Sequence, residues 1–318
     1  MLDHLNIENF MCFKELKIPT LKRVNLIAGK NNSGKTTLLD AIRILLAEGN
    51  STIVNHILND RKNFLRGSFE SYTHNTTNYN NPGKDVKINN LSIEFTWNMD
   101  GPFAVFNILN YINSDLEKES RNHLLDPFLF IENPIENLTY IPFKSNFTTL
   151  SSLWEKVALT DYEEDVYEIL KETIQPDLVR LNVGREVVNV RLENTDKPVP
   201  LSTLGDGVNR TLLIALSLVN AKNSILLIDE LELGLHYSAL EKLWNMIFKY
   251  AQKWNIQVFA TTHSQDVLRT FHYVSDDEKY IDDAQYIRLQ INRDGDNEAI
   301  IYDGERLRET LELQLEIR

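Results

Sequence analysis

Short apolar runs separated by polar turns dominate the N-terminal part of the chain. Residues 2–13 alternate between apolar and polar side chains, which predicts a strand, a turn near Cys12 and a second strand ending at Ile18. The apolar run Val24–Ala28 predicts a third, buried strand. Over residues 37–46 the apolar side chains recur at helical spacing and fall on one side, which predicts a helix.

Beyond this first helix the pattern weakens and polar residues become more frequent. It predicts a short helix within 50–63, a polar surface loop over 71–84 and a charged helix within 114–123. Alternating apolar and polar residues predict the strands of a meander at Asp85–Asn89, Leu91–Trp97 and Ala104–Asn107.

Apolar residues at helical spacing within 147–173 predict two helices, followed by a pair of strands. The expected strands are Leu178–Val183 and Val187–Leu192. We expect the two helices to form a short arm that separates two lobes of one composite domain. The predicted bounds are 1–145 for the N-terminal lobe, 146–183 for the arm and 184–318 for the C-terminal lobe.

Two continuous apolar runs, Ser224–Glu230 and Ile256–His263, predict strands buried on both faces of a parallel sheet. The other elements expected here are helices at Thr211–Val219, Ser238–Trp254 and 305–313, and strands at Ala284–Ile291 and Ala299–Tyr302. This alternation predicts an α/β fold, with a mixed central sheet, flanking helices, an antiparallel β lobe and the short helical arm.

The turn between the third strand and the first helix matches the phosphate-loop pattern G-x-x-x-x-G-K-[ST] at every required position. Its glycines let backbone N–H groups curl around a phosphate, and the helix N-terminus adds positive potential there. Lys35 is expected to reach the β- and γ-phosphates of ATP, and the Thr36 hydroxyl to bind Mg²⁺. The predicted nucleotide-binding residues are Gly29, Asn32, Ser33, Gly34, Lys35, Thr36 and Thr37.

The two buried parallel strands end in residues that complete an ATPase site. Asp229 and Glu230 end the first strand, where Asp229 would hold Mg²⁺ and Glu230 would orient or deprotonate the attacking water. Glu232 is a rival for the role of base. His263 ends the second strand, and a neutral imidazole there could hydrogen-bond the γ-phosphate or the water. Glu230 and His263 are the predicted catalytic residues.

A second glycine-rich turn precedes the apolar helix expected at Thr211–Val219. Its Ser202, Gly205 and Gly207 could form another anion-binding nest at a helix start. Because one protomer does not need two such nests for one phosphate chain, we expect this nest to contact ATP bound to a second subunit. The pattern therefore predicts a homodimer, or a higher homo-oligomer, formed through ATP, in which a two-fold pair of subunits encloses two ATP molecules.

Composition and net charge limit which classes of protein and which partners fit the sequence. The chain is 42% hydrophobic and 25% charged, as is ordinary for a globular protein. Its formal net charge of −13 argues against a surface wrapped in nucleic acid, although DNA contact through a local basic strip stays open. The single cysteine, Cys12, fits a reducing compartment, and no apolar run is long enough to span a membrane. We expect a cytoplasmic protein.

The order of these motifs resembles that of the ABC-type ATPases of the RecF/SMC/OLD branch. The likeness includes Ile7-Glu8-Asn9-Phe10 before the phosphate loop and Glu232-Leu233-Gly234-Leu235-His236 after the Asp-Glu pair. It also includes Thr261-Thr262-His263-Ser264 at the end of the second buried strand. The Leu-Gly-Asp-Gly form of the nest and the ending from Tyr302 to Leu313 are similar to OLD-like AAA-type ATPases. The resemblance implies a P-loop NTPase of ABC type.

That resemblance also implies ATP-dependent dimerisation and slow hydrolysis, with ATP acting as a switch. Many relatives serve in defence against phage, and in OLD-like and Gabija-like proteins a TOPRIM nuclease domain follows the ATPase. The chain leaves no room for such a domain after His263. We therefore expect the ATPase of a two-component system, similar in layout to PARIS, whose nuclease or toxin effector is a separate polypeptide.

The sequence departs from the family pattern at two places. No glutamine occurs between Lys35 and Gln175, so the Q-loop glutamine of the family is absent or replaced. Either Ser202 or Gly205 takes the place of the signature serine. A DNA-repair clamp of RecF type is the alternative function, and the acidic charge argues against it. A transporter ATPase subunit is less favoured, because of the missing glutamine and the N-terminal strand pattern.

Overall fold

The computed structural model describes most of the chain. The described residues are 1–50, 53–54, 57, 86–98, 105–112, 120–124, 135, 137–143, 147–184, 186–193, 195, 197–205 and 207–302, with the backbone alone for 92–98, 105–112 and 120–124. The loop expected over 71–84 and the helix expected over 305–313 lie outside these residues, as does most of the helix expected within 50–63.

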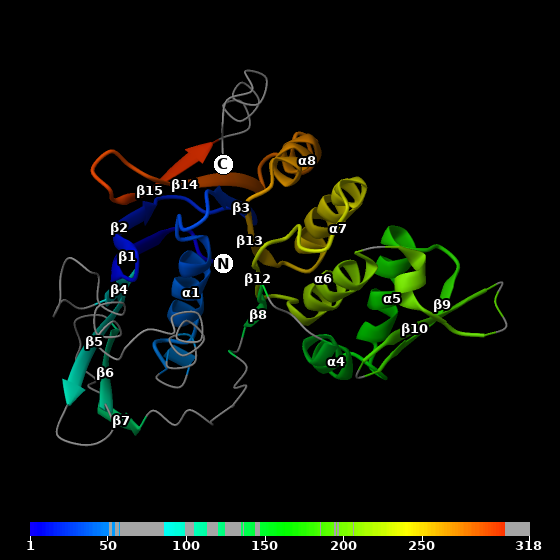
Figure 1. Cartoon of the computed structure of the whole chain (residues 1–318), viewed down its shortest axis with the longest axis horizontal. Coiled ribbons are helices and arrows are strands. Elements are labelled where there is room, and N and C mark those ends of the chain that lie inside the picture. The colour runs from blue at the N-terminus through cyan, green and yellow to red at the C-terminus, as the bar shows by residue number, and fades with distance from the viewer. Residues whose placement is uncertain are drawn as a thin grey trace.

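A six-stranded sheet forms the centre of the molecule, in the order β15-β14-β3-β13-β12-β8 (Figure 1). Five of its strands run parallel, and β15 closes one edge antiparallel to β14. All residues of β3, β12 and β13 are buried, as expected for continuous apolar runs inside a parallel sheet. The strands span Val24–Gly29 (β3), Leu138–Ile141 (β8), Ile225–Ile228 (β12), Gln257–Thr262 (β13), Ala284–Ile291 (β14) and Asn297–Tyr302 (β15).

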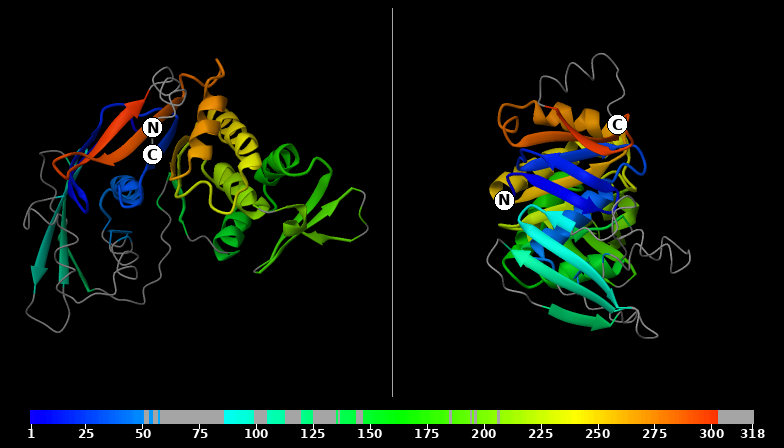
Figure 2. Two further views of the ribbon diagram at one scale, coloured as in Figure 1. Left: turned by 45° about the horizontal axis from the view of Figure 1, so that its top comes forward. Right: turned by 90° about the vertical axis from the view of Figure 1, so that its left-hand side faces the viewer.

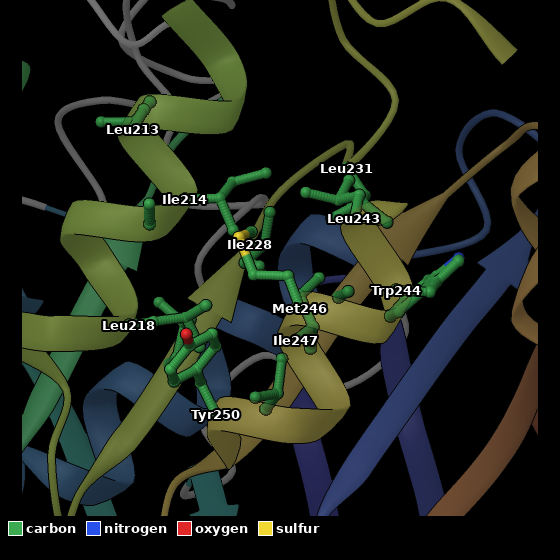
Figure 3. Close-up of a cluster of buried hydrophobic side chains, with 14 of the residues drawn as sticks. Leu213, Ile214, Leu218, Ile228, Leu231, Leu243, Trp244, Met246, Ile247 and Tyr250 are labelled. Carbon is green, nitrogen blue, oxygen red and sulfur yellow. The ribbon is translucent and has the colours of Figure 1, made fainter. Parts of the chain in front are cut away.

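Three helices cover one face of this sheet: α6 (Val208–Asn220), α7 (Leu240–Lys253) and α8 (Gln265–Ser275). Figure 3 shows side chains of α6 and α7 meeting around Ile228 of β12. The Trp244 indole is fully buried and donates from Nε1 to the carbonyl oxygen of Val267 at 3.2 Å. The indole satisfies its one polar atom and ties α7 to α8.

The opposite face of the central sheet packs against α1 (Lys35–Leu46) and a second, antiparallel sheet in the order β2-β1-β4-β5-β6-β7. Helix α1 lies between the two sheets (Figures 1 and 2), and most of its side chains are buried. The strands of this sheet span Leu5–Phe10 (β1), Phe13–Ile18 (β2), Val86–Ile88 (β4), Leu91–Asn98 (β5), Val105–Ile112 (β6) and Ser120–Leu124 (β7).

Helices α4 (Phe147–Glu155) and α5 (Tyr162–Thr173) lie on the outer side of α6, beside a three-stranded sheet in the order β11-β10-β9 (Figure 1). The strands of this small sheet span Leu178–Val183 (β9), Val188–Leu192 (β10) and Val199–Pro200 (β11). Two ion pairs join α7 to α5: Lys249 with Glu172 at 2.6 Å and Lys253 with Glu168 at 3.1 Å. The division of the chain into lobes and arm at 145 and 183 stays a prediction.

The fold class and most expected elements are confirmed, with a few corrections. The prediction of a helix within 114–123 is wrong for residues 120–123, because Ser120–Leu124 is strand β7, paired with β6. Helix α1 begins two residues earlier than expected and α6 three residues earlier, since each follows a glycine in the left-handed conformation. Strand β8 and helix α8 were not expected. Among the described helices, none has the length and apolar character needed to cross a bilayer.

Candidate active site

The phosphate loop joins the end of β3 to the first residue of α1, Lys35. Two of its residues have left-handed backbone, Asn32 at φ 65° and Gly34 at φ 94°. A Cβ atom on Gly34 would lie 2.6 Å from the ring of Phe13 and 2.9 Å from Sγ of Cys12. Glycine is therefore required here both by the backbone angle and by the close turn between β1 and β2.

Lys35 lies over this loop. Its Nζ atom donates to the carbonyl oxygens of Gly29 at 2.8 Å and Lys30 at 3.1 Å, and the residue is 8% exposed. Burial lowers the pKa of the Lys35 ammonium, against the opposing attraction of nearby carboxylates that include Glu230 and Asp229. The cation is thus held beside the loop in the position that a phosphate chain requires.

The loop is also held from the far end of the chain. Asn297, a buried residue of β15, donates from Nδ2 to the carbonyl oxygen of Ser33 at 3.0 Å. The hydroxyl oxygen of Ser33 is buried and has no hydrogen-bond partner among the described residues. This orphaned hydroxyl and the left-handed turn fit a phosphate ligand. Sequence reasoning missed Asn297, because no local motif marks it.

Asp229 follows β12 and lies beside the start of α1. The Thr36 hydroxyl donates to Asp229 Oδ1 at 3.3 Å, and the Thr261 hydroxyl of β13 donates to the same oxygen at 2.7 Å. Oxygen atoms of hydroxyl and carboxylate groups are the ligands that Mg²⁺ prefers, and two ligands on an octahedral edge lie about 3 Å apart. Thr36 and Asp229 could therefore hold Mg²⁺.

Glu230 lies at the end of the same strand in a left-handed conformation, at φ 50°. Its backbone N–H donates to the Thr261 hydroxyl at 2.8 Å, and the buried Arg210 of α6 donates from Nη2 to the carbonyl oxygens of Asp229 and Glu230, each at 2.9 Å. Burial raises the pKa of the Glu230 carboxyl above its ordinary value. These contacts hold Glu230 in an unfavourable backbone conformation.

His263 follows β13, the strand beside β12. Its Nδ1 atom lies 3.1 Å from Glu232 Oε1 and 3.8 Å from Glu230 Oε1. The backbone N–H of His263 also donates to Glu232 Oε1 at 3.0 Å. The parallel pairing of β12 with β13 thus brings His263 to the predicted carboxylates, and Glu232 contacts it more closely than Glu230 does.

The second glycine-rich turn lies between β11 and α6, beside the loop that follows β12. Ser202 is part of the 3₁₀ helix Leu201–Leu204, and Gly205 and Gly207 have φ of 136° and 83°. A Cβ atom on Gly207 would lie 2.7 Å from the carbonyl oxygen of Gly234. The nest therefore packs on the loop that follows β12, whereas Lys35, Thr36, Asp229, Glu230 and His263 gather around the phosphate loop.

Strand β8 pairs with β12 beside Asp229, and no glutamine follows β8 in the sequence before Gln175. The backbone N–H of Asp229 donates to the carbonyl oxygen of Ile141, the last residue of β8, at 2.9 Å. The chain continues from there with Pro142 and the partly exposed Phe143. Proline and phenylalanine offer no side-chain oxygen, so they cannot replace a glutamine as a ligand for water or metal.

Comparison with known proteins agrees with this geometry. Residues 101–269 match the family described as "AAA domain, putative AbiEii toxin, Type IV TA system", and residues 1–126 match "AAA ATPase domain". An "ATP/GTP phosphatase" of Helicobacter pylori is 24% identical, over 86% of this chain and 88% of that protein. "Uncharacterized protein MJECL10" of Methanocaldococcus jannaschii is 29% identical, over 57% of this chain and 84% of that protein.

Solved structures give the same fold. The SMC head domain from Thermotoga maritima superposes with a TM-score of 0.51 at 14% identity, over 95% of this chain and 99% of that one. An SMC head bound to the C-winged helix domain of ScpA also has a TM-score of 0.51 at 14% identity, over 96% and 99%. The chain therefore belongs to the AAA-domain family whose description reads "putative AbiEii toxin, Type IV TA system", as an ABC-type ATPase with the fold of SMC heads.

Proposed function

We propose that this ATPase acts as an ATP-dependent switch, and that it is the regulatory subunit of a bacterial two-component defence system against phage. The observation that supports a switch is the group formed by Lys35, Thr36, Asp229, Glu230 and His263. Three separate segments of the chain bring these side chains together at one phosphate loop. Such an arrangement binds and cleaves a nucleoside triphosphate and then changes its contacts when the γ-phosphate leaves.

Each residue has a distinct role in the proposed reaction. Lys35 and the loop N–H groups neutralise and position the phosphate chain, while Thr36 and Asp229 would hold Mg²⁺, which would supply charge stabilisation there. Glu230 orients the attacking water and accepts its proton, because it directly follows Asp229 at the end of β12 and its carboxylate is more exposed than that of Glu232. His263 provides a hydrogen-bonding group beside the γ-phosphate.

Two protomers close head to tail around two ATP molecules in this proposal. The support is the position of the nest, which packs on Gly234 rather than on the phosphate loop of its own chain. Ser202, Gly205 and Gly207 then contact the γ-phosphate held by the other subunit. Since both nests in a two-fold dimer are used in the same way, two identical sites form at once.

The defence role has support from the relatives. The family description names a toxin and a Type IV toxin–antitoxin system, and one SMC head of similar fold was solved with a bound winged-helix domain. A family of ATPases that works with a second protein fits the proposal of a separate effector, either a nuclease of TOPRIM type or a toxin. The effector would be restrained or released according to the nucleotide state of the dimer.

The test is a tagged purification of Glu230→Gln from its native host in ATP and Mg²⁺, followed by sedimentation and mass identification of bound proteins. Glutamine keeps the size of the side chain but cannot accept the proton, so we expect a trapped dimer carrying a nuclease or toxin. Lys35→Ala is the matched control and should stay monomeric. A dimer that binds only DNA would replace this proposal with the repair-clamp function, and co-purified membrane protein would indicate a transporter.

A further inference from the structure

Glu232 has contacts that the proposed hydrolysis does not use. Its Oε1 atom receives the backbone N–H of His263 at 3.0 Å and lies 3.1 Å from Nδ1 of the same residue. The Glu232 side chain is 14% exposed, and its Oε2 atom is buried with no hydrogen-bond partner among the described residues. A carboxylate buried this far is costly unless it makes specific contacts. Its short side-chain contacts in the described part of the chain are with His263, and the charges of Lys35 and Arg210 also act on it.

We propose that Glu232 is the positioning residue of His263. An ionised carboxylate only accepts hydrogen bonds, so the His263 nitrogen that faces Glu232, Nδ1, must carry its proton. The other nitrogen, Nε2, is then the one presented to the nucleotide. The backbone contact holds the start of the His263 loop to the same oxygen, so ring and main chain are oriented together. This inference rests on the proposed role of His263 in the ATP site.

The same contacts argue against Glu232 as the catalytic base. Its Oε1 atom has two nitrogen neighbours within 3.1 Å, whereas Glu230 Oε1 lies 3.8 Å from Nδ1 of His263, beyond hydrogen-bond range. Glu230 is also more exposed, at 27% of its side chain. Glu230 therefore keeps an oxygen available for water, while Glu232 holds the histidine in the way that a buried carboxylate holds an imidazole in one tautomer.

Kinetics of four variants test this assignment. Glu232→Ala removes the acceptor and should lower kcat about 10- to 100-fold with a KM changed by less than about 3-fold. Glu232→Gln keeps a carbonyl oxygen at the same place and should retain activity within about 5-fold. If Glu232 acts through His263, the double variant Glu232→Ala/His263→Ala should be no slower than His263→Ala alone. The exposed Glu278→Ala serves as the control.

Two kinetic results would overturn the assignment. A Glu232→Gln variant as inactive as Glu230→Gln would make Glu232 a base, since glutamine still offers His263 a carbonyl acceptor but cannot take a proton. Multiplicative losses in the double variant would show that Glu232 acts independently of His263.

A second readout does not depend on turnover. Histidine-selective ¹⁵N labelling of the whole chain without nucleotide reports which ring nitrogen carries the proton, and His263→Ala identifies the signal among the seven histidines. We expect Nδ1–H in the wild type and in Glu232→Gln, and a changed ratio of tautomers in Glu232→Ala. Nε2–H in the wild type, or no change in Glu232→Ala, would contradict the inference. If ATP is not hydrolysed, the Nδ1–H result still stands, so the two failures are distinguishable.

Discussion

Three residues of the site have left-handed backbone, and each is where a ligand or a reacting group is expected. Asn32 and Gly34 are residue types that tolerate this conformation, but Glu230 is not, and its φ is 50°. The Thr261 hydroxyl and the Arg210 guanidinium hold the backbone around Glu230. These partly buried hydrogen bonds maintain a strained backbone at a carboxylate beside the phosphate loop. Such strain favours the interpretation of Glu230 as a catalytic residue.

Lys35→Ala should abolish ATP turnover. The side chain is the cation held against the loop by the carbonyl oxygens of Gly29 and Lys30. We expect a loss of at least about 100-fold in turnover, with binding of fluorescent ATP weakened as well. The measurement is phosphate release at saturating ATP, with thermal melting to show that the variant is folded. Unchanged turnover would remove the phosphate-loop assignment.

Glu230→Gln should stabilise the protein at neutral pH. Burial raises the pKa of Glu230 above 4.5, so ionised Glu230 is less favourable in the folded chain than in the unfolded one. Its contribution to stability is present below the unfolded pKa and is lost as pH rises through the folded pKa. The Tm of Glu230→Gln should therefore exceed that of the wild type at pH 7, and the difference should shrink as the pH falls toward the unfolded pKa.

Thermal melting of both proteins between pH 4 and pH 8 checks this result. A Tm difference that grows toward acid pH would mean that the carboxylate is stabilised in the fold, contrary to the effect of burial. The same raised pKa predicts that ATP turnover of the wild type falls on the acid side as the base becomes protonated.

Motif residues could be predicted from the sequence because their spacing is local. The phosphate loop, Asp229 and Glu230 each lie within a few residues of a recognisable strand or helix. Arg210, Thr261 and Asn297 could not be predicted, since their importance comes from partners on other elements. For Glu232 the sequence suggests only the role of a rival base. Its contact with His263 depends on how β12 pairs with β13, which the sequence does not show.

At the scale of elements, α6 connects the nest to the reacting end of β12. The helix begins just after Gly207, and Arg210 in its first turn donates to two carbonyl oxygens beyond β12. Because the guanidinium is buried, its removal would leave those carbonyl oxygens without their charged donor. We therefore expect a nucleotide that contacts the nest to affect, through α6 and Arg210, the same backbone that positions Glu230.

Gly207→Ala and Gly234→Ala form a matched pair that tests this connection. Both glycines have positive φ, 83° and 73°, so alanine is strained at each by about 1 kcal/mol. A Cβ atom on Gly207 also meets the Gly234 carbonyl oxygen at 2.7 Å, while nothing lies within 4 Å of one on Gly234. Urea unfolding should show a loss of about 2–4 kcal/mol for Gly207→Ala and about 1 kcal/mol for Gly234→Ala. Equal losses would mean that the nest is not packed on this loop.

The errors in the expected elements have physical causes. Strand β7 lies in a segment whose charged residues favour a helix, and its pairing with β6 overrides that preference. Strand β8 has four residues, too few to show a period, and its place is fixed by pairing with β12. Helix α8 did carry a signal, with Ser264 capping apolar residues at helical spacing, and it could have been predicted.

At the scale of the whole molecule, the candidate ATP site lies at the ends of the parallel strands β3, β12 and β13, beside the first turn of α1. Figure 1 shows α1 between the two main sheets. The chain carries a formal net charge of −13 and a calculated pI of about 5.1. Two such protomers repel each other at long range, and bound ATP adds more negative charge to the interface. Closure of the proposed dimer must overcome this repulsion through contacts at the nests and the phosphates.

Salt should therefore strengthen ATP-dependent association. Ions screen the repulsion between the two acidic protomers, so the dimer Kd of Glu230→Gln in ATP and Mg²⁺ should fall about 2- to 5-fold between 50 and 250 mM salt. Binding to a DNA duplex has the opposite dependence, because neutralising phosphates releases counterions that added salt opposes. Sedimentation velocity across this range, with Lys35→Ala as the control that lacks ATP, measures the trend. A dimer weakened by salt would show that local pairs of opposite charge outweigh the net charge at the interface. A complex that forms only with duplex DNA and dissociates as salt rises would favour the repair-clamp function instead.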